Sequence, residues 1–244
     1  MSTIELFDDK YPTFDPHFVS QGNIGDCWLI SVLFSLSINE KGKKILKDSF
    51  YINNDGTYTI KLLDEKRKNN YVKIPCKFKI NKTTNQLKYS GHSLNIPEIF
   101  MDNPSNEYIW ASIFEKAISK YAGCIRKLDG NYACSAFKLL CNNEYEICYG
   151  YGINLRFLER FYTMFKNSNI ACVIEFLNNK FEIIEEDNII TNHAYSLYDI
   201  EVDKDKYFWY LYNPHKQFVN KESCLKIDIF KVKIYINLIT YIKL

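Results

Sequence analysis

One apolar segment, residues 27–36, constrains the fold of this chain more than any other. It reads Cys-Trp-Leu-Ile-Ser-Val-Leu-Phe-Ser-Leu, so one broad face and much of the other would be buried, as in a helix at the centre of a domain. Gly25 and Asp26 precede it, and we expect a tight turn there, with Asp26 accepting hydrogen bonds from the first free N–H groups. Cys27 would then lie at the positive end of the helix, where a thiol ionises more readily than a free cysteine. The pattern predicts a nucleophile.

Most lone cysteines are small buried hydrophobic residues, and Cys27 has to be judged against that alternative. Gln21 lies six residues upstream, where a loop could fold its side-chain amide over the start of the helix. The motif Gln-Gly-x-x-Gly-Asp-Cys-Trp-Leu resembles the calpain family within the papain-like cysteine proteases. The resemblance implies that Cys27 is the nucleophile and that the Gln21 side chain, with the Cys27 backbone N–H, stabilises the oxyanion.

Two extended, aromatic-rich runs near the C-terminus predict an antiparallel hairpin. They span residues 192–202 and 207–214, on either side of a charged turn. Counting outward from residue 203 places His193 and Asn213 at equal distances, to within a residue or two, so opposed Cβ atoms would lie about 5 Å apart. Taken singly, the histidine could be packed or solvated, and the asparagine before proline could simply start a turn.

The order Cys27, His193, Asn213 is that of the papain-like triad. Asn-His-Ala-Tyr-Ser at residues 192–196 resembles the calpains' Gly-His-Ala-Tyr-Ser, and Tyr-Asn-Pro at 212–214 resembles their Arg-Asn-Pro-Trp-Gly. The resemblance implies peptide-bond hydrolysis through a thioester. In that reaction His193 exchanges protons with the thiol, leaving amine and water, while Asn213 orients the imidazole.

The resemblance also extends to the middle of the chain. The helix expected over residues 107–121 is similar to the calpains' Trp-Ser-Ala-Leu-Leu-Glu-Lys-Ala segment. Beyond it the family has paired glycines that lend backbone to the substrate, and this chain keeps Gly130 but has Asn131 second. The resemblance therefore implies that Gly130 and Trp28 contact the substrate.

The pattern of helices and strands predicts an α+β protein that divides near residue 143. Before that point helical periodicity dominates, apart from a hairpin over residues 56–76, and after it strands dominate. The resemblance implies the two-lobed papain-like fold. A helix-rich N-terminal lobe (1–143) would carry the cysteine, and an antiparallel β-sheet or barrel-like C-terminal lobe (144–244) would carry the histidine and asparagine.

Classical calpains bind calcium in each lobe, and both sites are altered here. At the family's first calcium site, Phe18 and Tyr108 stand in place of two carboxylates. The second site lies in a long acidic loop after the Asn-Pro motif, and here that loop is shortened to residues 216–224. Calcium requires several converging oxygen ligands. We therefore expect no metal, no other cofactor, and lobes that assemble without calcium.

His215 replaces a family tryptophan that shields the Asn–His hydrogen bond, so we expect weaker shielding unless Trp209 or a neighbouring aromatic substitutes.

Composition excludes several other classes of protein. The formal charge is +2, from 31 basic and 29 acidic side chains, and no long block of one sign occurs. We therefore expect neither nucleic acid nor a membrane surface as a partner. No signal peptide and no span of about 18 apolar residues is visible.

The eight cysteines include no Cys-x-x-Cys pair, which argues against structural zinc and favours a reduced, cytoplasmic protein. Cys134, Cys141 and Cys148 recur every seven residues, so we expect them on one helical face, packed in the core.

Three functions remain open at this point. The favoured one is a calpain-like cysteine endopeptidase acting on polypeptide substrates. The second is a catalytically silent calpain-like interaction module, which His215 and the altered glycine pairs at Asn131 and Asn142–Asn143 would suit. The third is a papain-like isopeptidase or acyl transferase that uses the same residues.

Overall fold

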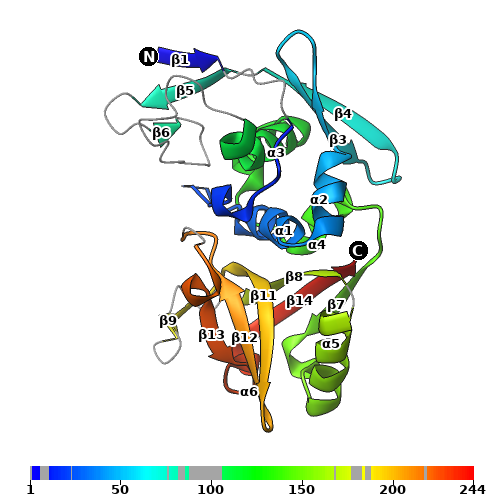
Figure 1. Cartoon of the computed structure of the whole chain (residues 1–244), viewed down its shortest axis with the longest axis vertical. Helices are drawn as coiled ribbons and strands as arrows, with labels where there is room; N and C mark the ends of the chain where they lie inside the picture. The colour runs from blue at the N-terminus through cyan, green and yellow to red at the C-terminus, as the bar shows by residue number, and fades with distance from the viewer. Residues whose placement is uncertain are drawn as a thin grey trace.

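The computed structural model describes residues 2–5, 11–22, 24–75, 77–81, 86–87, 106–167, 169–176, 183–184, 188–216 and 219–244. These residues form helices and antiparallel sheets, which confirms the α+β class. Figure 1 shows helices α1 to α4 gathered above a large sheet, with α5 beside the sheet. In the described part of the chain, no helix combines the length and apolarity that crossing a bilayer requires.

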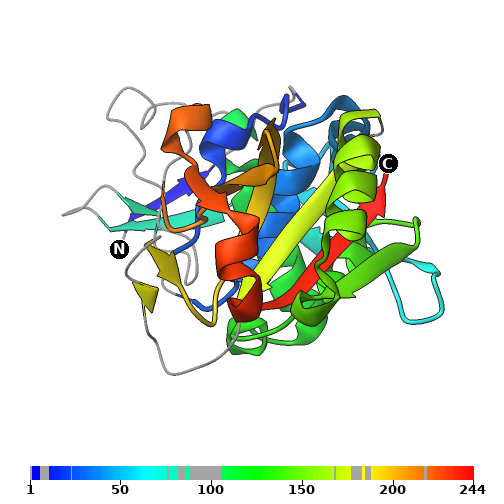
Figure 2. The ribbon, with the colours of Figure 1, turned by 90° about the horizontal axis from the view of Figure 1, so that it is seen from below.

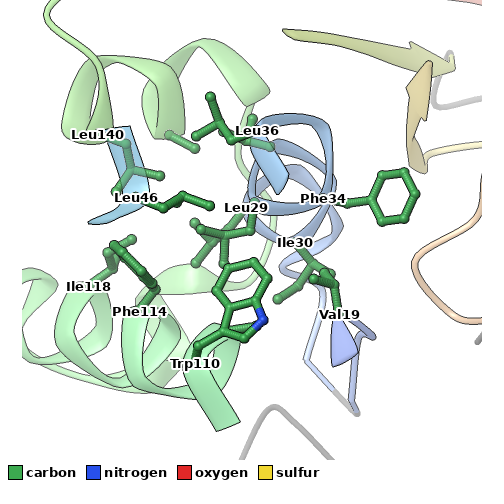
Figure 3. Close-up of a cluster of buried hydrophobic side chains, with 14 of the residues drawn as sticks. Val19, Leu29, Ile30, Phe34, Leu36, Leu46, Trp110, Phe114, Ile118 and Leu140 are labelled. Carbon is green, nitrogen blue, oxygen red and sulfur yellow. The ribbon is translucent and has the colours of Figure 1, made fainter. Parts of the chain in front are cut away.

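Helix α1 (Cys27–Ser37) is the central helix that the apolar segment predicts. Every residue from Trp28 to Ser37 is buried, because the helix has neighbours on both sides. In Figure 3, Leu29 points toward Trp110, while Phe34 points the opposite way. There the Phe34 ring stacks on Tyr212 with 3.8 Å between ring centroids. Fully burying a side chain of this size contributes roughly 1.5–3 kcal/mol. Because α1 buries side chains on opposite sides, it joins the two sides of the molecule.

The remaining elements of the first half surround α1. The helices are α2 (Glu40–Lys47), α3 (Asn106–Ala122) and α4 (Ala133–Leu140), with 3-10 turns η1 (Pro16–Phe18) and η3 (Ile125–Leu128). One sheet has the order β2 (Phe50–Ile52), β3 (Tyr58–Leu63), β4 (Asn69–Ile74), and another has the order β1 (Ser2–Glu5), β5 (Lys77–Asn81), β6 (Gln86–Leu87). The predicted hairpin is confirmed as β3–β4, in which Leu63 pairs with Asn69.

The second half is built on a six-stranded sheet with the order β13-β12-β11-β8-β14-β7, antiparallel throughout. Its strands are β7 (Tyr145–Tyr149), β8 (Ile170–Phe176), β11 (Ala194–Asp203), β12 (Lys206–Tyr212), β13 (Leu225–Asp228) and β14 (Ile236–Lys243). Strand β8 is buried along its whole length. Figure 2 shows why, since α5 (Leu155–Asn167) lies over one face of the sheet and α1 lies behind the other.

Smaller elements complete this half. They are the 3-10 turns η4 (Gly150–Gly152), η5 (Lys221–Ser223) and η6 (Lys233–Tyr235), the short helix α6 (Ile229–Val232), and the paired strands β9 (Ile183–Ile184) and β10 (Ile189–Ile190).

The hairpin that carries the predicted histidine and asparagine is confirmed as β11–β12, but its register differs from the prediction. The turn centres on Lys204 and Asp205, and a bulge at Tyr198 inserts one extra residue into β11. The last paired residues are Ser196 and Tyr212. Continued in the same register, His193 would oppose His215 rather than Asn213, because the turn is centred later than residue 203 and the bulge shifts the pairing back by only one residue.

Buried serines join α1 to the sheet. The Ser31 hydroxyl donates to the carbonyl oxygen of Ala194 at 3.0 Å, and the Ser196 hydroxyl donates back to the Ser31 carbonyl at 2.7 Å. One turn further along, Ser35 Oγ accepts the backbone N–H of Cys172 at 2.6 Å. These polar residues are tolerated in a core because each has a partner. They fix the cysteine-bearing helix relative to the strand that follows His193.

The seven-residue cysteine spacing does not mark a helix face, so that prediction is wrong. Cys134 lies in α4, Cys141 follows the end of that helix, and Cys148 lies in β7. The chain changes from helix to strand within the interval, so the period has no geometric meaning. The seven cysteines in the described part of the chain are free thiols.

Candidate active site

A cleft of about 720 Å³ opens where the start of α1 meets the start of β11. It brings together four of the predicted site residues: Gln21, Cys27, Gly130 and His193. The other lining residues come from both halves of the chain: Gly22, Ile24, Gly25, Asp129, Asn131, Tyr132, Glu175, Ile190, Thr191, Asn192, Ala194, His215 and Asn237.

The predicted contact between His193 and Asn213 is present. His193 Nε2 lies 2.9 Å from Asn213 Oδ1, and both residues are buried. The same oxygen accepts the backbone N–H of His215 at 3.0 Å, which fixes the orientation of the asparagine amide. Because Oδ1 can only accept, His193 carries its proton on Nε2 in this contact. Nδ1 is thus the ring nitrogen that carries no proton.

His215 covers the imidazole of His193. Its ring is stacked on that of His193, with 4.7 Å between centroids and 4° between planes. Tyr195 contacts the His193 ring edge-on at 4.9 Å. Trp209 does not substitute for the missing tryptophan, because it is buried against Phe161 of α5. The shield is therefore an imidazole, whose outer side is exposed.

Burial controls the charge of Cys27 and His193. It raises the pKa of the Cys27 thiol to about 11, although the backbone N–H of Ala194 favours the thiolate. Burial lowers the pKa of His193 to about 4, and the hydrogen bond to Asn213 opposes that shift. The expectation that the helix N-terminus makes Cys27 ionise readily is therefore not met in this structure, because desolvation outweighs it. Both groups are neutral at pH 7.

Asp26 does not cap α1, contrary to the prediction. Its side chain makes no cap hydrogen bond, and it is buried facing the carboxyl group of Glu115 on α3. Apart from this mutual contact, the four oxygens have no hydrogen-bond partner among the described residues. Burial raises the pKa of Asp26 to about 7 and that of Glu115 well above its usual range. The pair therefore retains a proton, and one of its members, Asp26, directly precedes Cys27.

Gln21 reaches the start of α1 as predicted. Its side-chain Nε2 donates to the carbonyl oxygen of Ile24 at 2.6 Å, which holds the amide against the loop before Cys27. Its backbone N–H donates to the carbonyl oxygen of Pro214 at 2.7 Å. Gln21 is thus tied directly to the loop that carries Asn213.

Gly130 lies on the cleft and Trp28 does not. Gly130 has a φ of +72°, favourable for glycine, and its N–H donates to the carbonyl oxygen of Gly25 at 2.9 Å. A Cβ at Gly25 would lie 2.4 Å from Asp129 Oδ1, so the carboxylate could not keep its present position against a larger residue. Trp28 is only 2% exposed, and its indole N–H donates to the Leu128 carbonyl, so it supports the cleft wall from behind.

Glu175 is the lining residue that sequence reasoning missed. It lies in β8, and its carboxylate reaches the first turn of α4, where Oε1 accepts the N–H of Ala133 at 3.0 Å. Burial raises the pKa of Glu175 to about 7. The available signal was a single acid within the apolar run Ile-Ala-Cys-Val-Ile-Glu-Phe at residues 170–176.

The described residues contain no group of three or more His, Cys, Asp or Glu side chains arranged to hold a metal ion. Phe18, at one of the positions where calpains have a calcium ligand, lies in η1. Tyr108 stands at the other calcium-ligand position, and its side chain is not among those that the structure describes.

Two comparisons place this arrangement among known proteins. The sequence profile described as "Calpain family cysteine protease" matches residues 3–219. Calpain-8 of Mus musculus is 24% identical over 191 residues, which cover 75% of this chain and 25% of that protein. The chain thus spans about a quarter of the length of this curated relative.

Proposed function

The chain belongs to the calpain family of cysteine proteases, and from that premise we propose that it is an endopeptidase that cleaves polypeptides with Cys27, His193 and Asn213. One observation carries the proposal. Cys27 and His193 line the same cleft, although 166 positions (193 minus 27) separate them in the sequence. Asn213 Oδ1 is hydrogen-bonded to Nε2 of the His193 imidazole.

The reaction begins with a proton transfer inside the cleft. His193 Nδ1 takes the thiol proton of Cys27, and the sulfur attacks the peptide carbonyl carbon. The imidazolium then protonates the leaving amine as the C–N bond breaks, which leaves a thioester. Next His193 takes a proton from water, the hydroxide attacks the thioester, and the thiol is regenerated. Asn213 keeps the ring in the required tautomer throughout.

The neutral resting pair is compatible with this cycle. Two opposite charges created next to one another in a buried cleft stabilise each other, which compensates for the desolvation that each would bear alone. The N–H of Ala194 favours the thiolate form of Cys27. We propose that the thiolate–imidazolium pair is the reactive form and that substrate binding, which expels water, promotes it.

The oxyanion is stabilised by the Gln21 side chain and the Cys27 backbone N–H. Gln21 Nε2 carries two N–H groups, and one of them already donates to Ile24, which fixes the direction of the other. Donors held in place before the reaction are effective because they need no reorganisation in the transition state.

We further propose that the chain divides near Asn143 into two papain-like lobes that assemble without calcium. Direct contacts support this. The hydrogen bonds of Ser31 and Ser35 hold α1 on the sheet, and the backbone of Gln21 holds the loop at Pro214. Both lobe surfaces are thereby joined through protein groups close to the reacting residues.

The test uses the full chain with a fluorescently labelled, unstructured protein substrate. We expect cleavage by the unmodified protein and none by Cys27→Ala. Cys124→Ala is the matched control, because Cys124 is an exposed thiol that does not line the cleft. Equal cleavage by Cys27→Ala and the unmodified protein would refute the proposal.

One observation favours a second candidate, a catalytically silent interaction module. Burial holds Cys27 as a thiol and His193 as a neutral imidazole. Labelling with a cysteine-directed epoxide separates the candidates, because an active site should modify Cys27 faster than the other cysteines. An isopeptidase or acyl transferase would also be labelled, and differs in the substrates that it consumes.

A further inference from the structure

The cleft beside Cys27 has an acidic lining. Asp129 and Glu175 are its two carboxylates, and no lysine or arginine is among the described residues that line it. Asp129 is exposed, and its Oδ1 accepts the N–H of Gly25 at 3.2 Å. Glu175, by contrast, is only 6% exposed. A carboxylate that is buried in a cleft without a cation calls for an explanation.

Hydrogen bonding satisfies only part of the Glu175 carboxylate. Oε1 accepts the N–H of Ala133 at 3.0 Å, whereas Oε2 lies 3.5 Å from Thr240 Oγ1, at the limit of a hydrogen bond. No lysine, arginine or histidine of the described residues forms an ion pair with Glu175 within the 4 Å range of such contacts. In this state burial raises the pKa of Glu175, as expected for a carboxyl group without a compensating positive charge.

The residues around Glu175 form a defined subsite of the cleft. Ala194 is its neighbour on β11, in direct register, and Leu238 is its neighbour on β14. Strand β14 bulges at Asn237, which lines the cleft. Tyr132 lines the cleft just before Ala133. We call Tyr132, Glu175, Ala194 and Asn237 the Glu175 subsite.

The chemistry of the Glu175 subsite suits a long cationic side chain. Ala194 lines the cleft with only a methyl group, while the ring of Tyr132 and the amide of Asn237 can contact an aliphatic stem and its polar end. A guanidinium or ammonium group at the bottom would meet Oε2 of Glu175, the less satisfied oxygen.

A structural role does not explain why residue 175 is glutamate rather than glutamine. Its Oε1 joins β8 to the first turn of α4, but a glutamine carbonyl oxygen could accept the same N–H of Ala133. We propose that the Glu175 subsite binds a lysine or arginine side chain of the polypeptide near the bond that is cleaved. This proposal rests on the proposed function, because it names the substrates of the same cleft.

The experiment measures kcat/KM for a set of fluorogenic peptides in which each position on either side of the cleavage site is lysine, arginine or norleucine. Norleucine keeps most of the lysine stem without the charge. At one position we expect lysine or arginine to exceed norleucine by about tenfold or more, the size of one charged hydrogen bond. In Glu175→Gln this ratio should fall at least about fivefold, because the amide can keep the hydrogen bond to Ala133 but carries no charge.

Two further variants locate the effect. Asn237→Lys places a cation inside the Glu175 subsite and should abolish the preference even if Glu175→Gln does not fold. Asp129→Asn should leave the preference in place, and its loss there would assign the cation to Asp129 instead. No basic preference at any position, or a preference unchanged in Glu175→Gln and Asn237→Lys, overturns the inference while peptide cleavage itself stands.

Binding separates failure of the inference from failure of the proposed function. Fluorescence anisotropy of the lysine and norleucine peptides with Cys27→Ala requires no turnover. Tighter binding of the lysine peptide, lost in Cys27→Ala/Glu175→Gln, would support the Glu175 subsite even if the unmodified protein cleaved nothing. Equal binding of both peptides to Cys27→Ala, with no cleavage by the unmodified protein, would refute both proposals.

Discussion

The imidazole rings of His193 and His215 lie face to face, with 4.7 Å between their centroids and 4° between their planes. The stack places a titratable group where an apolar shield would otherwise cover the hydrogen bond between His193 and Asn213. His215 is held there by its backbone N–H, which donates to the same asparagine oxygen. A charge on His215 opposes protonation of His193 and lowers its pKa. His215 thus affects both the solvation and the charge of His193.

Removing the shield should slow catalysis. In His215→Ala, water reaches the bond between His193 and Asn213, and we expect kcat/KM to fall about tenfold, the value of one net hydrogen bond. His215→Phe keeps a stacked ring without the charge and should restore most of the activity. Steady-state kinetics on one peptide measures both variants. Unchanged kcat/KM in His215→Ala would show that the stack has no role.

Truncating the oxyanion donor should reduce turnover selectively. In Gln21→Ala we expect kcat to fall by about 10²–10³ with little change in KM, because the donor acts on charge that develops in the transition state. The backbone N–H bond to Pro214 remains in this variant, so the loop should keep its place. A thermal melt checks that point, and an undiminished kcat would exclude Gln21 from the oxyanion hole.

Two buried serines of α1 provide a matched pair of variants. Ser35→Ala leaves the N–H of Cys172 buried without its partner, and should destabilise the fold by about 1–3 kcal/mol with kcat unchanged. Ser31→Ala removes the bond to Ala194, the residue after His193, so it should destabilise the fold and also lower kcat severalfold. Urea unfolding and steady-state kinetics measure the two effects. Equal kcat in both variants would contradict a positioning role for Ser31.

The buried pair of Asp26 and Glu115 should make stability depend on pH. The pKa of Asp26 is raised to about 7 on folding, so the folded state binds more protons than the unfolded chain between about pH 4 and 7. This contribution to stability is fully present below about pH 4 and is lost as the pH rises through 7. In Glu115→Gln the amide can donate to Asp26, so the loss between pH 5 and pH 8 should shrink by roughly 2 kcal/mol.

Urea unfolding at pH 5 and pH 8 measures this difference. Glu65→Gln serves as the control, because Glu65 is exposed on the turn between β3 and β4. A Glu115→Gln protein with the same pH dependence as the unmodified chain would show that the two carboxyl groups do not share a proton.

Calcium should have no effect on this protein. We expect kcat/KM and the melting temperature to be the same, within error, with excess chelator and with millimolar calcium, because protein groups alone hold α1 on the sheet. Activity that disappears with the chelator and returns with calcium would contradict the proposed assembly.

The sequence predicts those parts of the molecule that depend on local patterns. The continuous apolar run defines α1, the alternating aromatic runs define β11–β12, and the motif spacing leads to Cys27, His193 and Asn213. Predictions fail where a contact depends on tertiary packing. Asp26 has the sequence position of a cap, yet it faces Glu115, a residue 89 positions later (115 minus 26). No local pattern encodes such a pair.

Register is the second limit. Counting from the charged turn predicts that His193 opposes Asn213, but the bulge at Tyr198 and the later turn centre shift the pairing. The hydrogen bond between them survives because side chains reach diagonally across a hairpin. His215 becomes the direct neighbour of His193 as a result, and the stack could not be predicted without the bulge.

The single backbone bond from the Gln21 N–H to the Pro214 carbonyl oxygen has a mechanical consequence. One end carries the amide that we propose as the oxyanion donor, and the other end adjoins Asn213, which is hydrogen-bonded to His193. Breaking the hydrogen bond between Gln21 and Pro214 by separating the two halves would displace both side chains at once. If the two halves were pulled apart there, we would expect catalytic activity to be lost in one step rather than gradually.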